Sequence, residues 1–485
     1  MDSLARLDHL HLWHPFTQMR DWLDREPIVI VEGRGAVLRD SRGREYLDGN
    51  SSIWTNLHGH NHPRLNAALG AQARRIAHSS ALGLANEPAS RLAARLVSLA
   101  APAGGARPPA DPPAPRLEKV FFSDDGSTAI EVALKLAHET ARRLDDRSKP
   151  RVLSLDGAYH GDTIGAVSAG HIDLFHQTWS RLLFRTDKVM APYCYRCRFN
   201  RASPQRQDAR DYRRCGWECL DEVEKRLERG RKSRNPYTAF FFEPLVQGAA
   251  GIIPQPPGWL RRATDLARGF GARLVADEVM TGFGRTGCHL VGQAAGSATP
   301  GLFACQAEGV VPDFLAVAKG LTGGYLPMAA TLTTAEVFGA FLGEYEEFRT
   351  FFHGHSFTGN QLGAATALAS LDLLEGRASV EARRRLEAAL RFELARLWDL
   401  PQVGDVRQVG LVVGVELVSD WRRRTPFDLR ERAGIRVCEA MVRHGVLTRP
   451  VGNVVVLIPP YCTMPAQARQ MVAALHAAIR ETLGT

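Results

Sequence analysis

The chain has 485 residues and is 45% hydrophobic, so it can bury a large core and suits two or three compact domains. Its formal net charge is +9, but Lys and Arg are scattered among Asp and Glu, so no nucleic-acid partner is expected. No apolar run is long enough to span a bilayer, and no signal-peptide core follows the first residues. These features predict a cytoplasmic enzyme with no membrane partner.

The central part of the chain alternates between two kinds of element. The stretch 127–140 has apolar residues at helical spacing, and Gly126 and Ser127 form its entry. Short apolar runs with β-rich composition lie at 152–155, 239–242, 274–276, 314–317 and 329–332. Such runs, separated by helices, predict an α/β fold with a mainly parallel sheet that is covered on both faces.

Three stretches interrupt this pattern and are expected to be insertions. They lie near 101–115, which is rich in Pro, Ala and Gly, near 193–219, which contains four cysteines, and near 288–301, which is small and polar. From about residue 379 onward, helical stretches alternate with strands such as 411–415 and 454–458. The C-terminal part is therefore predicted to form a smaller α+β domain.

Asp277 and Glu278 follow an apolar strand and precede a glycine-rich turn. Ligands gather at the carboxyl ends of parallel strands, and a buried carboxylate there can hold the protonated ring nitrogen of a cofactor. Asp277 fits that role, although both carboxylates can also simply cap the turn. The glycines at 282, 284 and 287 match a dinucleotide-binding pattern, but that pattern must open a helix, and the residues after Gly287 have no helical period. A dehydrogenase is therefore disfavoured.

Lys319 follows the apolar run 314–317 and precedes a glycine-rich turn. Burial at such a place lowers the pKa of an amine and makes it a nucleophile for an aldehyde. Gly126 and Ser127 at a helix start can bind phosphate through backbone N–H groups and a hydroxyl. Tyr159 follows another strand and can stack on a flat ring. Each feature also has an ordinary explanation, as a solvated lysine, a capped helix or a core tyrosine.

Together these residues resemble the class III aminotransferases. The matching segments are 12–19, 48–54, 58–63, 159–163, 243–248, 353–360 and the stretches around Asp277 and Lys319. The resemblance implies the fold type I of pyridoxal 5'-phosphate (PLP) enzymes, with a large domain at 76–378 and a small domain built from 1–75 and 379–485. It implies that Lys319 forms the Schiff base with PLP and that Asp277 holds the pyridine nitrogen.

The resemblance also assigns the remaining site residues. Tyr159 would stack on the ring, Gly126 and Ser127 would bind the phosphate, and Ser356 would reach the phosphate of a second subunit, which implies a homodimer with shared sites. Four residues are implied to contact the substrate: Trp54 and Phe16 as apolar walls, Gly354, and Arg449 as the group that receives a carboxylate.

The implied activity is transamination of the ketone of 8-amino-7-oxononanoate to give 7,8-diaminononanoate in biotin biosynthesis. The amino donor is S-adenosylmethionine or lysine. Phe16, Ile53 and Val456 stand where users of S-adenosylmethionine carry Tyr or Trp, and this favours lysine. The alternatives are another class III aminotransferase, an aminomutase of the glutamate-semialdehyde type, and a binding protein that lacks activity.

Cys194, Cys197, Cys215 and Cys219 form two closely spaced pairs that are separated by seventeen residues. The spacing is close to that of a zinc ribbon, and clustered thiols in a reducing compartment favour a metal over disulfides. We therefore expect either a structural Zn²⁺ site or free thiols at this insert.

Overall fold

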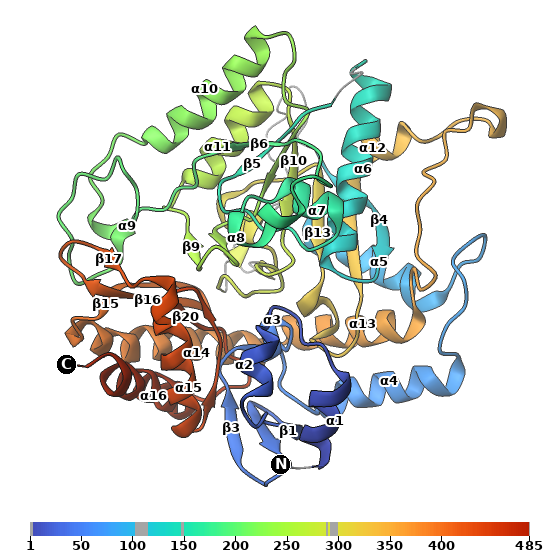
Figure 1. Ribbon diagram of the computed structural model, residues 1–485. Coiled ribbons are helices and arrows are strands. Elements are labelled where there is room, and N and C mark those ends of the chain that lie inside the picture. Colours follow the sequence, from blue (N-terminus) through green and yellow to red (C-terminus); the bar gives the residue numbers. More distant parts are fainter. Residues whose placement is uncertain (1–2, 102–114, 147–149, 288–289, 292–298, 485) are drawn as a thin grey trace.

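The computed structural model describes residues 3–101, 115–146, 150–287, 290–291 and 299–484. The α-helices are α1 (Ser3–His11), α2 (Met19–Leu23), α3 (Ser51–Trp54), α4 (Pro63–Arg75), α5 (Glu87–Ala100), α6 (Gly126–Leu144), α7 (Ile164–Ala169), α8 (Asp173–His176), α9 (Ala209–Tyr212), α10 (Glu218–Lys232), α11 (Trp259–Gly269), α12 (Ala335–Gly339), α13 (Gln361–Glu375), α14 (Arg377–Leu394), α15 (Ala433–Arg443) and α16 (Pro465–Leu483) (Figure 1). Short 3-10 helices occupy Gln177–Trp179, Ala304–Glu308, Lys319–Thr322, Tyr345–Glu347, Ala395–Asp399 and Leu429–Glu431.

The strands form one central sheet and several smaller sheets. The central order is β4 (Leu117–Ser123), β14 (Ala329–Thr334), β13 (Phe314–Val317), β10 (Arg273–Asp277), β7 (Ala239–Phe242), β5 (Val152–Leu155) and β6 (Asp187–Val189). The N-terminal sheet contains β1 (Ile30–Arg34), β2 (Val37–Asp40), β3 (Glu45–Asp48) and β18 (Val446–Leu447). The C-terminal sheet contains β15 (Val403–Val409), β16 (Val412–Asp420), β20 (Val454–Leu457), β19 (Pro450–Val451) and β17 (Thr425–Pro426). Two ribbons pair β8 (Val246–Gln247) with β9 (Ile253–Pro254) and β11 (Leu290–Val291) with β12 (Thr299–Pro300).

The central sheet confirms the predicted α/β fold. Strands β13, β10, β7, β5 and β6 run parallel, and β14 is antiparallel to both of its neighbours. The carboxyl ends of the parallel strands therefore meet at one edge, where ligands are expected in such sheets. The predicted strands at 152–155, 239–242 and 314–317 have the same bounds in the structure.

Helices cover both faces of the central sheet, and successive side chains of each strand point alternately into the two cores. In β7, Phe240 and Phe242 belong to the core beneath α5, α11 and α13, whereas Phe241 belongs to the core beneath α6 and α7. In β10, Ala276 and Val275 divide in the same way. The alternation places the last side chain of each strand at a fixed position on the edge.

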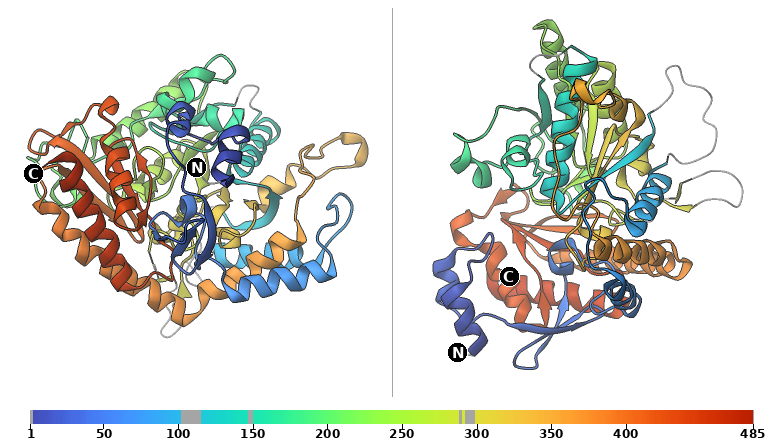
Figure 2. Two further views of the ribbon diagram at one scale, coloured as in Figure 1. Left: turned by 60° about the horizontal axis from the view of Figure 1, so that its bottom comes forward. Right: turned by 90° about the vertical axis from the view of Figure 1, so that its right-hand side faces the viewer.

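The two ends of the chain lie together. Strand β3 pairs in parallel with β18, and the blue N-terminal and red C-terminal elements share the lower half of the molecule in Figure 1 and in the right view of Figure 2. This pairing agrees with a small domain built from 1–75 and 379–485, whose boundaries stay a prediction. Most of the expected insertions at 101–115 and 288–301 lie outside the described residues.

None of the helices in the described ranges is both long enough and apolar enough to cross a membrane.

Candidate active site

Three acidic or imidazole side chains meet at the carboxyl ends of adjacent parallel strands. Asp277 ends β10, Glu243 follows β7, and His160 lies in the turn after β5. His160 Nδ1 lies 2.7 Å from Asp277 Oδ2, and the backbone N–H of Val279 donates to Asp277 Oδ1 at 3.0 Å. The sequence prediction named Asp277 but missed the roles of His160 and Glu243, although each residue stands just after a predicted strand.

Burial and neighbouring groups together set the charges of His160 and Glu243. Burial disfavours the charged form of His160, but the hydrogen bond to Asp277 and the negative charges of Asp277 and Glu243 together outweigh burial, so the pKa of His160 is raised. Burial raises the pKa of Glu243 to about 7. Glu243 accepts hydrogen bonds from the backbone N–H groups of Tyr159 (3.3 Å) and Gly248 (2.7 Å). His160 therefore supplies the positive partner of Asp277, and Glu243 ties two neighbouring loops together.

Lys319 begins the short 3-10 helix after β13, the strand next to β10. Its Nζ lies 4.6 Å from the centroid of the Trp54 ring. Burial lowers the pKa of Lys319 to about 8, and the charges of Asp277 and Glu243 oppose this shift only in part. With this pKa, roughly a fifth of the amine is neutral near pH 7.4, far more than for an ordinary lysine, which suits a nucleophile.

The turn that carries Trp54 is left-handed. Ser51, Ser52, Ile53 and Trp54 have φ angles of 46°, 48°, 63° and 68°, so α3 is not a right-handed helix. Left-handed backbone costs roughly 1–2 kcal/mol per residue for side chains other than Gly. Asp48 Oδ1 accepts from the backbone N–H groups of Asn50 and Ser52 at 3.2 and 3.1 Å and thereby holds the turn.

A second anchor of this turn comes from the glycine-rich segment 282–287. Arg285 is fully buried, and its guanidinium donates to the carbonyl oxygens of Trp54 (3.3 Å) and Asn56 (2.9 Å). Residues 288–289 and 292–298 lie outside the described residues, and the described pair Leu290–Val291 forms strand β11 rather than a helix. The segment instead supports the wall of the site.

The start of α6, with Gly126 and Ser127, forms a cradle that packs closely against two neighbouring turns. A Cβ atom on Gly126 would lie 2.7 Å from Val279 Cγ1, and one on Gly161 would lie 2.1 Å from Ser127 Oγ. Both positions therefore require glycine. Ser127 Oγ accepts the backbone N–H of Asp162 at 3.2 Å. The cradle lies beside the turn after Asp277 and at the positive end of a helix of 19 residues.

Tyr159 connects the cradle to the outer edge of the site. Its hydroxyl donates to Asp162 Oδ2 at 2.6 Å, and its ring lies 6.2 Å from that of Phe175. Phe175 in turn meets Phe16 edge-on at 5.3 Å, and Arg449 Nη2 donates to the Phe16 carbonyl at 3.3 Å. Phe16 and Arg449 are both exposed. The structure thus brings these two predicted substrate residues together at the same edge.

Ser356 and Gly354 lie on an exposed segment beside α6. His78 Nε2 lies 2.9 Å from the Ser356 carbonyl oxygen, and His353 Nδ1 lies 3.0 Å from Lys135 Nζ on α6. Across the residues that the structure describes, no hydrogen bond joins Ser356 or Gly354 to Lys319, Asp277 or Ser127 within this chain. Their predicted roles across a subunit interface and toward substrate stay predictions.

The four cysteines of the insert line one small cavity. Over the described ranges, no group of three or more His, Cys, Asp or Glu side chains already has a metal-binding arrangement. The predicted zinc site is therefore not preformed in this structure.

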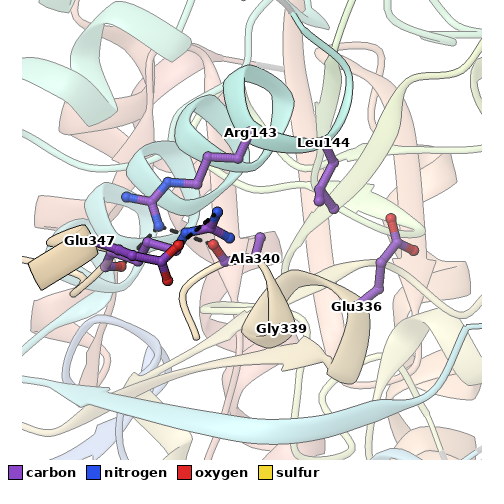
Figure 3. Close-up of a pocket in the computed structure, with 7 residues that line it drawn as sticks. Arg143, Leu144, Glu336, Gly339, Ala340 and Glu347 are labelled. Atoms are coloured by element: carbon purple, nitrogen blue, oxygen red, sulfur yellow. Dashed lines mark hydrogen bonds and ion pairs between the residues drawn. The ribbon is translucent and has the colours of Figure 1, made fainter. Parts of the chain in front are cut away.

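A larger hollow of about 460 Å³ lies on the surface near Arg143 of α6 and Glu336 of α12 (Figure 3). Arg143 Nη1 donates to the carbonyl oxygens of Ala340 and Arg349 at 3.0 and 2.8 Å, and its Nε donates to Glu139 Oε1 at 2.7 Å, so much of this guanidinium is already used within the protein. Arg143 is near the far end of α6 from Gly126, roughly 25 Å away along the helix at 1.5 Å per residue. The hollow is not part of the site.

Known proteins share this architecture over the full length. The family model described as Aminotransferase class-III matches residues 19–479. A protein of Geobacter sulfurreducens named adenosylmethionine-8-amino-7-oxononanoate aminotransferase is 46% identical, over 99% of this chain and 98% of its own. One of the same name from Nitratidesulfovibrio vulgaris is 47% identical, over 98% and 81%.

Solved structures agree with these relatives. The crystal structure of adenosylmethionine-8-amino-7-oxononanoate aminotransferase from Methanocaldococcus jannaschii matches with a TM-score of 0.85 and 35% identity, over 99% of both chains. An omega transaminase from Pseudomonas jessenii matches with a TM-score of 0.85 and 26% identity, over 99% of this chain and 98% of its own. The chain therefore belongs to the class-III aminotransferase family.

Proposed function

We propose that this chain is a PLP-dependent aminotransferase that converts 8-amino-7-oxononanoate to 7,8-diaminononanoate in the biosynthesis of biotin. The names of relatives at 46% and 47% identity support this substrate. The observation that carries the chemistry is the placement of Lys319 and Asp277 after two adjacent parallel strands, with Trp54 over the amine.

The residues of the site fit PLP. Asp277, paired with His160, offers a carboxylate for the pyridine nitrogen, and the cradle of Gly126 and Ser127 offers backbone N–H groups and a hydroxyl for the phosphate. Tyr159 offers a ring face near the same cradle. When bound, PLP supplies an aldehyde for the substrate amine and a ring that withdraws electrons from the adjacent carbon.

The chain's own groups would then bind, orient and move a proton. Lys319 is the base whose Nζ takes a proton from carbon and returns it, and its lowered pKa of about 8 suits that exchange. Trp54 covers the amine and limits the access of water. Arg449 at the outer edge is placed to receive a substrate carboxylate, while Phe16 offers an apolar contact to the aliphatic chain.

We further propose that the active form is a cytoplasmic homodimer. Several large apolar side chains are exposed near the segment that carries Gly354 and Ser356, among them Leu82 at 89% and Phe352 at 77%. Such a surface supports a protein partner, and a second copy would bring Ser356 to the neighbouring cradle. The described cysteines carry free thiols, which suits a reducing compartment.

The lowered pKa of Lys319 predicts how the cofactor-free chain captures PLP. Only the neutral amine attacks the aldehyde, so the capture rate should rise about tenfold per pH unit below pH 8 and level off above it. Stopped-flow absorbance of PLP mixed with the cofactor-free chain at pH 6 to 10 measures this rate. A midpoint near 10.5, the value of an ordinary lysine, would contradict the desolvated environment of Lys319.

The experiment that tests the proposed reaction supplies 8-amino-7-oxononanoate with either S-adenosylmethionine or lysine. The names of the relatives favour S-adenosylmethionine, whereas the apolar Phe16 at the edge favours lysine. Val456 says less about the amino donor, because it is buried in a cluster against which Trp54 packs. We expect 7,8-diaminononanoate, detected by mass spectrometry, with one donor only. Absence of the diamine with both donors would overturn the substrate assignment but not the family.

A further inference from the structure

The four cysteines of the insert converge from two segments. Cys194 and Cys197 lie in the loop after β6, while Cys215 and Cys219 lie just before and within the first turn of α10. All four line one cavity of about 10 Å³, together with Arg213 and Trp217. Seventeen residues separate the two pairs in sequence, so this convergence is a property of the fold.

Two donors stand next to the sulfur atoms. Arg213 Nη1 lies 3.3 Å from Cys215 Sγ. Trp259 is fully buried, and its indole Nε1 has no acceptor among the described residues, although it lies against Cys219. A buried N–H without a partner is costly. A thiolate on Cys219 would accept from it.

The loop around these cysteines contains little regular structure. Between β6 and α10, the described chain forms only the short helix α9. Its own apolar cluster consists of Cys194, Tyr195, Ala202, Ala209 and Tyr212, with Tyr193 packed against it. Long loops with little secondary structure are uncommon inside compact domains and are usually functional when they are ordered.

The same loop connects the large domain with the C-terminal sheet. Arg206 Nη1 donates to the Val403 carbonyl at 2.6 Å, Arg196 Nε donates to Glu416 Oε1 at 2.8 Å, and Arg210 Nη2 donates to the Gln408 carbonyl at 2.8 Å. Each contact reaches a residue of β15 or β16. A constraint on the cysteines would therefore fix a strap, residues 193–219, between the two parts of the molecule.

We propose that Cys194, Cys197, Cys215 and Cys219 bind one Zn²⁺ ion as a structural site that fixes this strap. Four thiolates are the ligand set of structural zinc, and soft sulfur ligands select it. Binding releases the thiol protons to solvent, and Arg213 offsets part of the remaining negative charge. The sulfurs are not yet gathered in the described structure, and metal binding would complete the site, because metal and ligand geometry form together.

The test uses the full chain with PLP bound, purified from cells grown with added zinc. Elemental analysis is expected to find about one zinc per chain, and X-ray absorption at the zinc edge is expected to show four sulfur ligands at roughly 2.3 Å. The double variant Cys197→Ser/Cys215→Ser should lose the zinc. Cys462→Ser, which changes an exposed thiol outside the cavity, is the matched control and should keep it.

Several outcomes would overturn the proposal. Zinc-free protein in which all four thiols react with a thiol reagent would do so, and so would zinc held by nitrogen or oxygen ligands, or zinc retained by the double variant. If the double variant does not fold, the absorption spectrum of the unaltered protein decides. Removal of zinc by a chelator should also speed proteolytic cleavage within 198–214. An unchanged cleavage rate would contradict the proposal that zinc fixes the strap.

Discussion

Lys319→Ala is expected to abolish the covalent link to PLP and to lower turnover by at least about 10⁴-fold, because the variant loses both the nucleophile and the base. Among the described residues, Lys319 is the lysine whose amine lies over the Trp54 ring, at 4.6 Å from its centroid. The link is measured by borohydride reduction followed by mass spectrometry of the intact chain, and turnover by formation of the diamine.

The matched control for this variant is Lys225→Ala. Lys225 lies on α10, its side chain is 65% exposed, and its ion-pair partner among the described residues is Glu222 at the surface. Surface ion pairs of this kind contribute little to stability. The control should therefore still show the added mass of the reduced cofactor and should keep full turnover. An Lys319→Ala variant with turnover equal to that of the control would reject the proposed chemistry.

Asp277→Asn is expected to lower kcat by about 10²–10³-fold, the usual loss when one preorganised electrostatic partner is removed. The side chain keeps its size, but it loses the negative charge that faces His160 at 2.7 Å. The pKa of His160 should fall, because burial then disfavours its charged form and the charge of Glu243 is left to oppose it. Steady-state kinetics measure the first effect, and NMR titration of the His160 ring measures the second.

Glu278→Gln is the neighbouring control for Asp277. Glu278 is fully buried, but it accepts from the backbone N–H groups of Ala304 (2.6 Å) and Cys305 (2.8 Å) and does not contact His160. Its replacement should lower the free energy of unfolding by about 1–3 kcal/mol and leave kcat within about tenfold. Equal loss of kcat in both variants would show that Asp277 acts through folding.

The sequence predicted the central strands well because their signal is local. Runs such as Ala239–Phe242 are buried on both faces, so every residue in them is apolar and the turn residues around them mark their ends. Lys319 and Asp277 were found for the same reason, since each follows such a run. Strand order has no comparable local signal, and without it the proximity of His160 to Asp277 could not be predicted.

The left-handed turn at Ser51–Trp54 could not be predicted for a different reason. Its residues carry side chains that disfavour positive φ, and the partners that hold the turn, Asp48 and Arg285, come from a neighbouring strand and from a turn far along the chain. Likewise, the positions of Ser356 and Gly354 relative to a second subunit depend on assembly. The resemblance identifies Ser356 and Gly354 as site residues, but a single chain does not show where they lie relative to the site of a second subunit.

The strained turn has a consequence for protein engineering. A glycine at Ser52 or Ile53 would relax the backbone, and screens that select for heat resistance would favour it. The same exchange would loosen the support of the aromatic wall above Lys319, so the selected variants would gain melting temperature and lose selectivity for substrates. Libraries that aim to widen the active site should therefore vary Trp54 itself and leave the three residues before it unchanged.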